Sequence, residues 1–191
     1  MQYTLFTMAM VICLLTGCQL FQTSPSSKNI ASQSTRNNCY SLLHQLLNDE
    51  KDVGMLRFIK REQPDVKNLI GKIAKHSADG SKLLEEFAKH DPSIVLEDIR
   101  LPSGEVATRD SIASTKKKEL LGQSGDEFEL SLLLAQAEAL SYASHLAEVA
   151  GKNETQPDRV RALKRLSDDM ANLYHEVFVM LLSKNRSTAS K

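Results

Sequence analysis

The chain has 191 residues, with 24 basic and 24 acidic side chains, no Trp and an aromatic content of 5%. A balanced charge without a clustered basic excess disfavours nucleic acid as a partner, and the scarcity of aromatic rings disfavours stacking sites for single strands. The length fits one ordinary domain with additional terminal segments.

The first residues form an apolar segment that is typical of a secretory signal. Its core runs from about Leu5 to Leu15, which is shorter than the ~20 residues of a membrane-spanning helix. It ends at Leu15-Thr16-Gly17-Cys18, which resembles the lipobox of bacterial lipoprotein signal peptides. This resemblance implies that residues 1–17 are a signal peptide, cut between Gly17 and Cys18, and that Cys18 is lipidated. Because residues 1–4 contain no Lys or Arg, an ordinary cleaved signal and an uncleaved anchor are the alternatives.

The same resemblance implies a location for the mature protein. In enterobacterial lipoproteins, a residue such as Gln19 after the lipidated cysteine points to the outer membrane, with the protein facing the periplasm. Two or more acyl chains anchor a protein stably, since each buried methylene contributes about 0.8 kcal/mol. Residues 19–37 are rich in Ser, Gln, Thr and Asn, so we expect residues 18–37 to be a flexible linker spanning roughly 25 Å.

Residues 38–184 are predicted to form an all-α domain. Asn38 is suited to cap a first helix that ends at the polar residues 48–52, and Pro64 is suited to the first turn of a later helix. Asp79-Gly80 is expected to break that helix.

Less regular sequence follows in the middle of the chain. Residues 93–104 predict an ordered connection that packs across the bundle. We then expect a helix from Ala107 to Leu121, with Ile112, Leu120 and Leu121 facing inward.

The last two helices give the strongest periodic signal. Apolar residues recur every three or four positions after Asp126 and again after Pro157, and the connection near Gly151 is short. A short connection makes two helices antiparallel neighbours, so we predict a four-helix-like bundle with a long C-terminal antiparallel hairpin and a disordered tail at 185–191. The expected inward residues are Phe128, Leu132, Ala135, Ala139, Tyr142, Leu146 and Val149, then Val160, Leu163, Leu166, Met170, Leu173, Val177 and Leu181.

No catalytic or metal-binding motif is recognisable. The sequence has no Gly-x-Ser-x-Gly elbow, no phosphate-binding glycine loop and no pair of Glu-x-x-His motifs. Glu138 and His145 fall on a predicted solvated helix face. We therefore expect no enzyme activity, no cofactor and no metal.

Cys39 is the one cysteine that remains if residues 1–17 are removed and Cys18 is lipidated. The simplest interpretation is a small buried apolar side chain in the first helical turn. The alternative is a disulfide between two chains, which would give a dimer through Cys39.

The second half of the chain resembles a ferritin-like domain family of secreted bacterial proteins without an agreed reaction. The resemblance rests on Leu101-Pro102, Leu120-Leu121, the segment Gly125-x-x-Phe128-Glu129, Gln136 and His175. Glu129 replaces the Asp that is usual in that family, and the His expected soon after Gln136 is absent, since the nearest is His145. The resemblance implies a four-helix fold and says little about activity.

These observations favour a membrane-anchored periplasmic lipoprotein that acts as a non-enzymatic interaction or accessory module of the cell envelope. Its expected partner is another envelope protein, and by analogy with small helical lipoproteins the process could be secretion or pilus assembly. The alternatives are a ferritin-like metal-binding protein, and an envelope enzyme or enzyme inhibitor that acts near peptidoglycan.

Overall fold

The computed structural model describes residues 27–53, 63–97 and 100–189, with side chains described from 31 to 184 within those ranges. The predicted signal peptide and Cys18 lie outside the described residues. The described part contains five helices and no strand, which confirms the all-α prediction. They are α1 (Ser27–Val53), α2 (Pro64–His90), α3 (Ser103–Gly122), α4 (Gly125–Lys152) and α5 (Pro157–Ala189).

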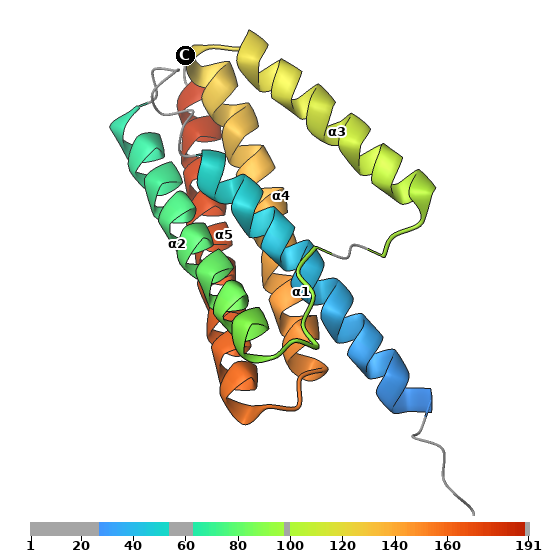
Figure 1. Cartoon of the computed structure of the whole chain (residues 1–191). Coiled ribbons are helices and arrows are strands. Elements are labelled where there is room, and N and C mark those ends of the chain that lie inside the picture. Colours follow the sequence, from blue (N-terminus) through green and yellow to red (C-terminus); the bar gives the residue numbers. More distant parts are fainter. Residues whose placement is uncertain (1–26, 54–62, 98–99, 190–191) are drawn as a thin grey trace, which may run out of the picture.

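Four of these helices form a bundle, and α3 lies beside it (Figure 1). Helix α1 packs against α2 and α4, while α5 packs against α4 and α2, so that α1 and α5 occupy opposite corners. Helices α1 and α5 run in one direction, and α2 and α4 run in the other. The bundle therefore has a single long crossover, which leads from the end of α2 through α3 to the start of α4.

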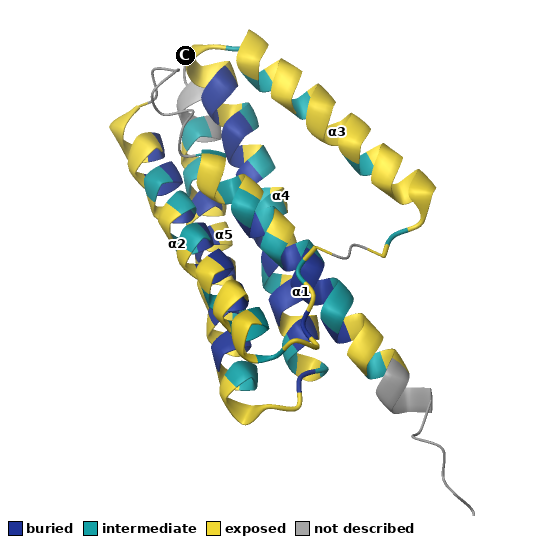
Figure 2. Cartoon of the chain, viewed as in Figure 1, coloured by how far each residue is buried: buried dark blue, intermediate teal, exposed yellow. Residues whose placement is uncertain are grey.

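The core lies along the bundle axis and is almost entirely apolar. Large side chains from all four bundle helices are fully buried there, among them Tyr40, Leu43, Ile73, Leu132 and Met170. In Figure 2 the buried residues face the centre of the bundle, whereas α3 is exposed over most of its surface. Each fully buried large apolar side chain contributes about 1.5–3 kcal/mol, so the four-helix contact provides most of the driving force for folding.

Helix α1 begins at Ser27, eleven residues before the predicted start at residue 38. The predicted flexible linker is therefore wrong for residues 27–37, and the predicted break at residues 48–52 is also wrong. Tertiary contacts explain the early start: Ser32 Oγ donates to Asn153 Oδ1 at 2.9 Å, and Arg36 Nη2 donates to Ser93 Oγ at 3.2 Å. A polar sequence is held helical here by the elements it contacts.

Helix α2 begins at Pro64 as predicted, but it does not break at Asp79-Gly80. Gly80 is buried where α2 crosses two other helices. A Cβ atom at this position would lie 2.9 Å from Leu166 Cδ1 and 3.0 Å from Leu47 Cδ1. The glycine thus serves close helix packing, and the helix tolerates its low propensity because the neighbouring leucines fill the space.

Helix α3 has no buried residue, and its main described contact with the bundle is with α4. The prediction that Ile112 and Leu121 face inward is wrong, since Ile112 is 51% exposed and Leu121 is 47% exposed. Long polar side chains make the contact instead: Arg109 Nη2 donates to Tyr142 Oη at 2.8 Å, and its guanidinium lies over the Tyr142 ring.

Helix α4 buries a different stripe from the predicted one. Phe128, Leu132 and Leu146 are buried as expected, but Tyr142 and Val149 are exposed and belong to the side that faces α3 or solvent. The residues that complete the buried stripe lie mostly one position further along: Leu140, Ala143, Ala147 and Ala150. On α5 the prediction is confirmed for Leu163, Leu166, Met170, Leu173 and Val177.

The C-terminal end of the chain also differs from expectation. Helix α5 continues to Ala189, so the predicted disordered tail at residues 185–191 is wrong for residues 185–189. Residues 190 and 191 lie outside the described part.

Candidate functional site

An exposed apolar surface runs along the outer side of the α4–α5 hairpin. It consists of Leu130 and Leu134 on α4 and of Tyr174, Phe178 and Leu182 on α5, and we call these five residues the hairpin strip. Their side chains are between 37% and 51% exposed. The Tyr174 and Phe178 rings stack with centroids 6.3 Å apart and an interplanar angle of 20°. Exposed apolar side chains that gather on two adjacent helices are typical of interaction sites.

Helical spacing places these five side chains on one side of the hairpin. Ser144 on α4 and Ser167 on α5 face each other, because each hydroxyl donates to the backbone carbonyl of the other residue at 2.9–3.0 Å. At about 3.6 residues per turn, Leu130 lies about 40° and Leu134 about 80° around α4 from Ser144, both away from the buried stripe, whereas Tyr174 and Phe178 each lie about 20° around α5 from Ser167. The strip therefore borders the seam between α4 and α5.

The prediction from sequence gives each helix a single apolar stripe and therefore does not include the hairpin strip. A second signal was present, since Leu130 and Leu134 are four apart, as are Tyr174, Phe178 and Leu182. Four-residue spacing on an amphipathic helix that already buries another face indicates a second contact surface.

At the opposite end of the bundle, a buried ionic network closes the α4–α5 turn. Glu154 accepts hydrogen bonds from Arg159 Nε and Tyr40 Oη, both at 2.9 Å, and lies 3.7 Å from Arg36 Nη1. Arg159 Nη2 also lies 2.9 Å from Asp91 Oδ2. The network joins α1, the segment after α2, the turn and α5 into one rigid end.

The charges of this network are fixed by their partners. Burial alone would raise the pKa of Glu154, but the hydrogen bonds from Arg159, the Gln156 backbone and Tyr40 outweigh it and lower the pKa. Burial and the hydrogen bond to Glu154 raise the pKa of Tyr40, so its hydroxyl stays protonated. Because the described polar atoms of the network pair with one another, its geometry indicates a structural role rather than catalysis.

Two further sets of polar contacts lie near the end of the bundle where α4 begins. Glu129, which is buried, accepts hydrogen bonds from Lys184 Nζ and from the Gln63 backbone, each at 2.5 Å. Gln136 Nε2 donates to Glu50 Oε2 at 2.7 Å, and burial raises the pKa of Glu50 to about 7. Two residues of the ferritin-like resemblance, Glu129 and Gln136, thus form bonds between helices.

Cys39 is a free, buried thiol with 7% exposure, and burial raises its pKa. The interpretation as a small buried side chain fits this position, but Cys39 lies well inside α1 (Ser27–Val53) and not in its first turn as predicted. A disulfide to a second chain would require the α1 contact region to open first, because the sulfur is covered in the folded monomer.

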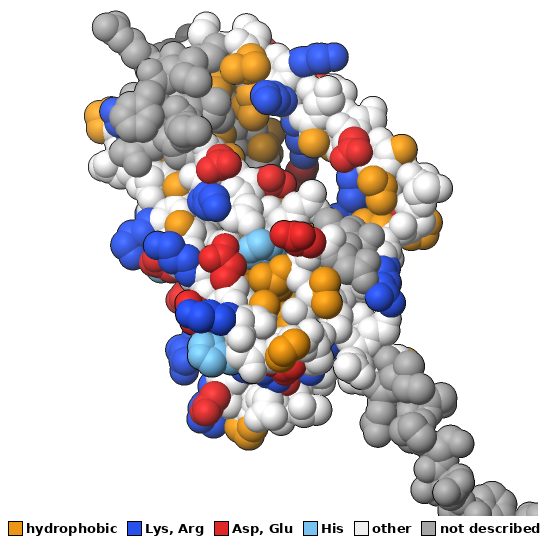
Figure 3. Space-filling view, viewed as in Figure 1, with side chains coloured by type: hydrophobic (Ala, Val, Ile, Leu, Met, Phe, Trp, Pro, Cys, Tyr) orange, Lys and Arg blue, Asp and Glu red, His pale blue; other side chains and the backbone are white. Residues whose placement is uncertain are grey.

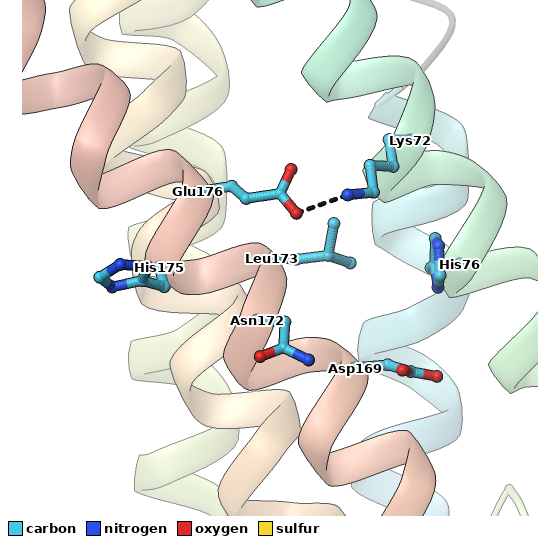
Figure 4. Close-up of a pocket in the computed structure, with 7 residues that line it drawn as sticks. All are labelled: Lys72, His76, Asp169, Asn172, Leu173, His175 and Glu176. Atoms are coloured by element: carbon cyan, nitrogen blue, oxygen red, sulfur yellow. Dashed lines mark hydrogen bonds and ion pairs between the residues drawn. The ribbon is translucent and has the colours of Figure 1, made fainter.

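The histidines considered in the sequence analysis are both exposed. His145 Nδ1 lies 2.7 Å from the Ser141 carbonyl oxygen on its own helix. His175 lies beside an open groove between α2 and α5 and points away from α2 (Figure 4). The groove has a volume of 360 Å³ and is lined by Lys72, His76, Asp169, Asn172, Leu173, His175 and Glu176.

The groove is an ordinary charged surface rather than a built site. Lys72 and Glu176 bridge it with an ion pair at 2.5 Å, and both side chains are nearly half exposed. Figure 3 shows basic and acidic side chains interspersed on the α1–α2 side of the molecule. Within the described residues no group of three or more His, Cys, Asp or Glu side chains could hold a metal ion.

None of the described helices is both long enough and apolar enough to cross a membrane. Gly17 and Cys18, the predicted cleavage and lipidation residues, lie outside the described part of the chain. Compared with models of known protein families, with curated proteins and with solved structures, the chain matches none of them.

Proposed function

We propose that this protein is a membrane-anchored periplasmic lipoprotein that works by protein–protein association, as an accessory module of the cell envelope. The hairpin strip carries the proposal, because five partly exposed apolar side chains on two adjacent helices form a surface suited to a protein partner. The lipobox residues Leu15 to Cys18 support the anchor.

The geometry of the chain fits such a role. Helix α1 starts at the end of the bundle that holds the α4–α5 turn, since Ser32 contacts Asn153 and Arg36 contacts Glu154. The hairpin strip lies toward the other end, where Lys184 contacts Glu129. A chain anchored through its N-terminal segment would therefore hold the strip away from its own attachment point.

Site-specific photo-crosslinking in a Gram-negative host tests this proposal. A photo-reactive amino acid is placed at position 134, within the strip, or at position 112 on α3. Leu134 and Ile112 are both apolar and both 51% exposed, so they form a matched pair. We expect adducts with an identifiable protein from position 134 and few from position 112. Equal yields from the two positions would remove the strip as an association surface.

One observation favours a second candidate, a ferritin-like metal-binding protein. The bundle has a single long crossover, and ferritin-like folds share this connectivity. Elemental analysis of the purified protein tests this alternative, which requires Fe, Mn, Cu or Zn in stoichiometric amounts.

A further inference from the structure

We infer that the hairpin strip is covered by a second copy of this chain, in a two-fold dimer whose axis runs parallel to α4 and α5. This inference rests on the proposed function, since it names the partner of the same surface. It places the dimer contact on the hairpin and not at Cys39, which is buried on α1.

The register of the hairpin makes the strip self-complementary. Ser144 and Ser167 are at one level, because each hydroxyl donates to the other residue's carbonyl. Leu134 lies ten residues before Ser144, and Phe178 lies eleven residues after Ser167, so these two side chains share a level one helix apart. Leu130 and Leu182 share the next level in the same way, and the ion pair between Glu129 and Lys184 confirms this register.

A two-fold axis parallel to the helices places α4 of one copy opposite α5 of the other. Leu134 then faces Phe178 of the second copy, and Leu130 faces Leu182, at matching heights. The reciprocal contacts follow from the symmetry, as they must in an isologous interface. Each α4 leucine therefore meets an apolar partner rather than a charge.

The exposed apolar area suits an interface between two copies. With exposures of 37% to 51%, the five side chains present about 400 Å² of apolar surface. A standard interface takes about 800 Å² from each partner, of which somewhat more than half is apolar. The strip thus supplies most of the apolar share, and its polar surroundings would supply the rim.

The position of the N-terminal segment selects this axis over a perpendicular one. Both copies in the parallel arrangement begin α1 at the same end, so two anchors at position 18 could enter one bilayer. A perpendicular axis would separate the two starts of α1 by at least the length of that helix, about 40 Å for 27 residues. Residues 19–26 reach at most about 28 Å when fully extended, so the parallel arrangement fits a shared membrane better.

Disulfide trapping in intact cells tests the arrangement with the full chain. Two differently tagged copies are co-expressed, one with Leu134→Cys and the other with Phe178→Cys, and the cells are treated with a mild oxidant. We expect a product that carries both tags at twice the mass of the chain, in higher yield than Leu134→Cys gives with itself. The pair Ile112→Cys and Phe178→Cys, and the chains without added cysteines, provide the background.

A second measurement uses the full chain purified in mild detergent, with its mass determined by analytical ultracentrifugation. Leu134→Glu should weaken the dimer at least tenfold, whereas Ile112→Glu should leave the dissociation constant unchanged within twofold. Both positions are exposed, so neither substitution should unfold the monomer. Circular dichroism melting of both variants checks that the monomer is folded.

The outcomes separate the dimer from the proposed function. A monomeric wild-type chain without a trapped product overturns the dimer, and adducts of position 134 with a different protein would leave the proposed function standing. Preferential trapping of Leu134→Cys with itself would overturn the parallel axis. If position 134 forms no adduct above position 112, the proposed function fails together with this inference.

Discussion

Replacement of Glu50 by Gln should stabilise the protein at alkaline pH and not at acidic pH. Glu50 on α1 accepts a hydrogen bond from Gln136 Nε2 at 2.7 Å, and burial raises its pKa from 4.5 to about 7. The Oε1 atom of Gln136 is buried and has no hydrogen-bond partner among the described residues. A glutamine at position 50 carries no charge and can donate to that oxygen.

The sign and size follow from proton linkage. Because the folded protein holds the Glu50 proton more tightly than the unfolded chain, folding becomes less favourable as pH rises between 4.5 and about 7. The free energy of unfolding of the wild type falls by about 3 kcal/mol near pH 8 and by less than about 1 kcal/mol at pH 5, relative to a protonated Glu50. The gain from Glu50→Gln should therefore grow by about 2 kcal/mol between these two pH values.

Urea unfolding of wild type and Glu50→Gln at pH 5 and pH 8 measures this difference. Glu86→Gln is the control, because the Glu86 side chain is 61% exposed and should change stability little at either pH. If the wild type and Glu50→Gln lose stability in parallel as the pH rises, the assignment of a desolvated carboxyl at position 50 is wrong.

Three further predictions, two of them with a control substitution, test the packing and the buried ions by urea unfolding at pH 7. Glu154→Gln should lower the free energy of unfolding by about 3–5 kcal/mol, because two arginines lose their buried charged partner. This difference from the wild type should shrink in acid, because the wild-type Glu154 becomes protonated below its lowered pKa. Gly80→Ala should destabilise by about 1–2 kcal/mol through overpacking, whereas Gly104→Ala, with open space around it, should be neutral or stabilising. Leu173→Ala should cost about 2–5 kcal/mol and His145→Ala less than about 0.5 kcal/mol, so equal effects would contradict the assigned helix faces.

The elements with strong apolar periodicity were predictable from the sequence. On α5 the stripe from Leu163 to Val177 is buried as the spacing indicates, and Pro64 and Pro157 begin their helices. On α4 the same reasoning chose Tyr142 and Val149 over Ala143 and Ala150. Helix α4 carries apolar residues on more than one side, so spacing alone could not decide which side meets the core.

Local signals failed where a tertiary contact overrides them. Gly80 breaks an isolated helix pattern, but here it provides the space that Leu47 and Leu166 occupy. The polar residues before Asn38 give no helical period, yet Arg36 is held by Ser93 and Glu154, far away in sequence. Such contacts depend on the assembled fold and leave no short-range pattern.

The candidate site was the least predictable part. The sequence contains no recognisable catalytic motif that would locate a site. A docking surface consists of ordinary apolar residues, and only their exposure in the folded protein distinguishes them from core residues. Leu130 and Phe178 resemble core residues in the sequence and become notable because other faces of α4 and α5 meet the bundle.

Mass spectrometry of the N-terminal peptide of the protein isolated from membranes tests the central claim most directly. A chain anchored to the envelope through Cys18 must begin at Cys18 and carry the mass of a diacylglyceryl group with its fatty acids on that residue. A peptide that still contains residues 1–17, or a Cys18 without added mass, would contradict the account.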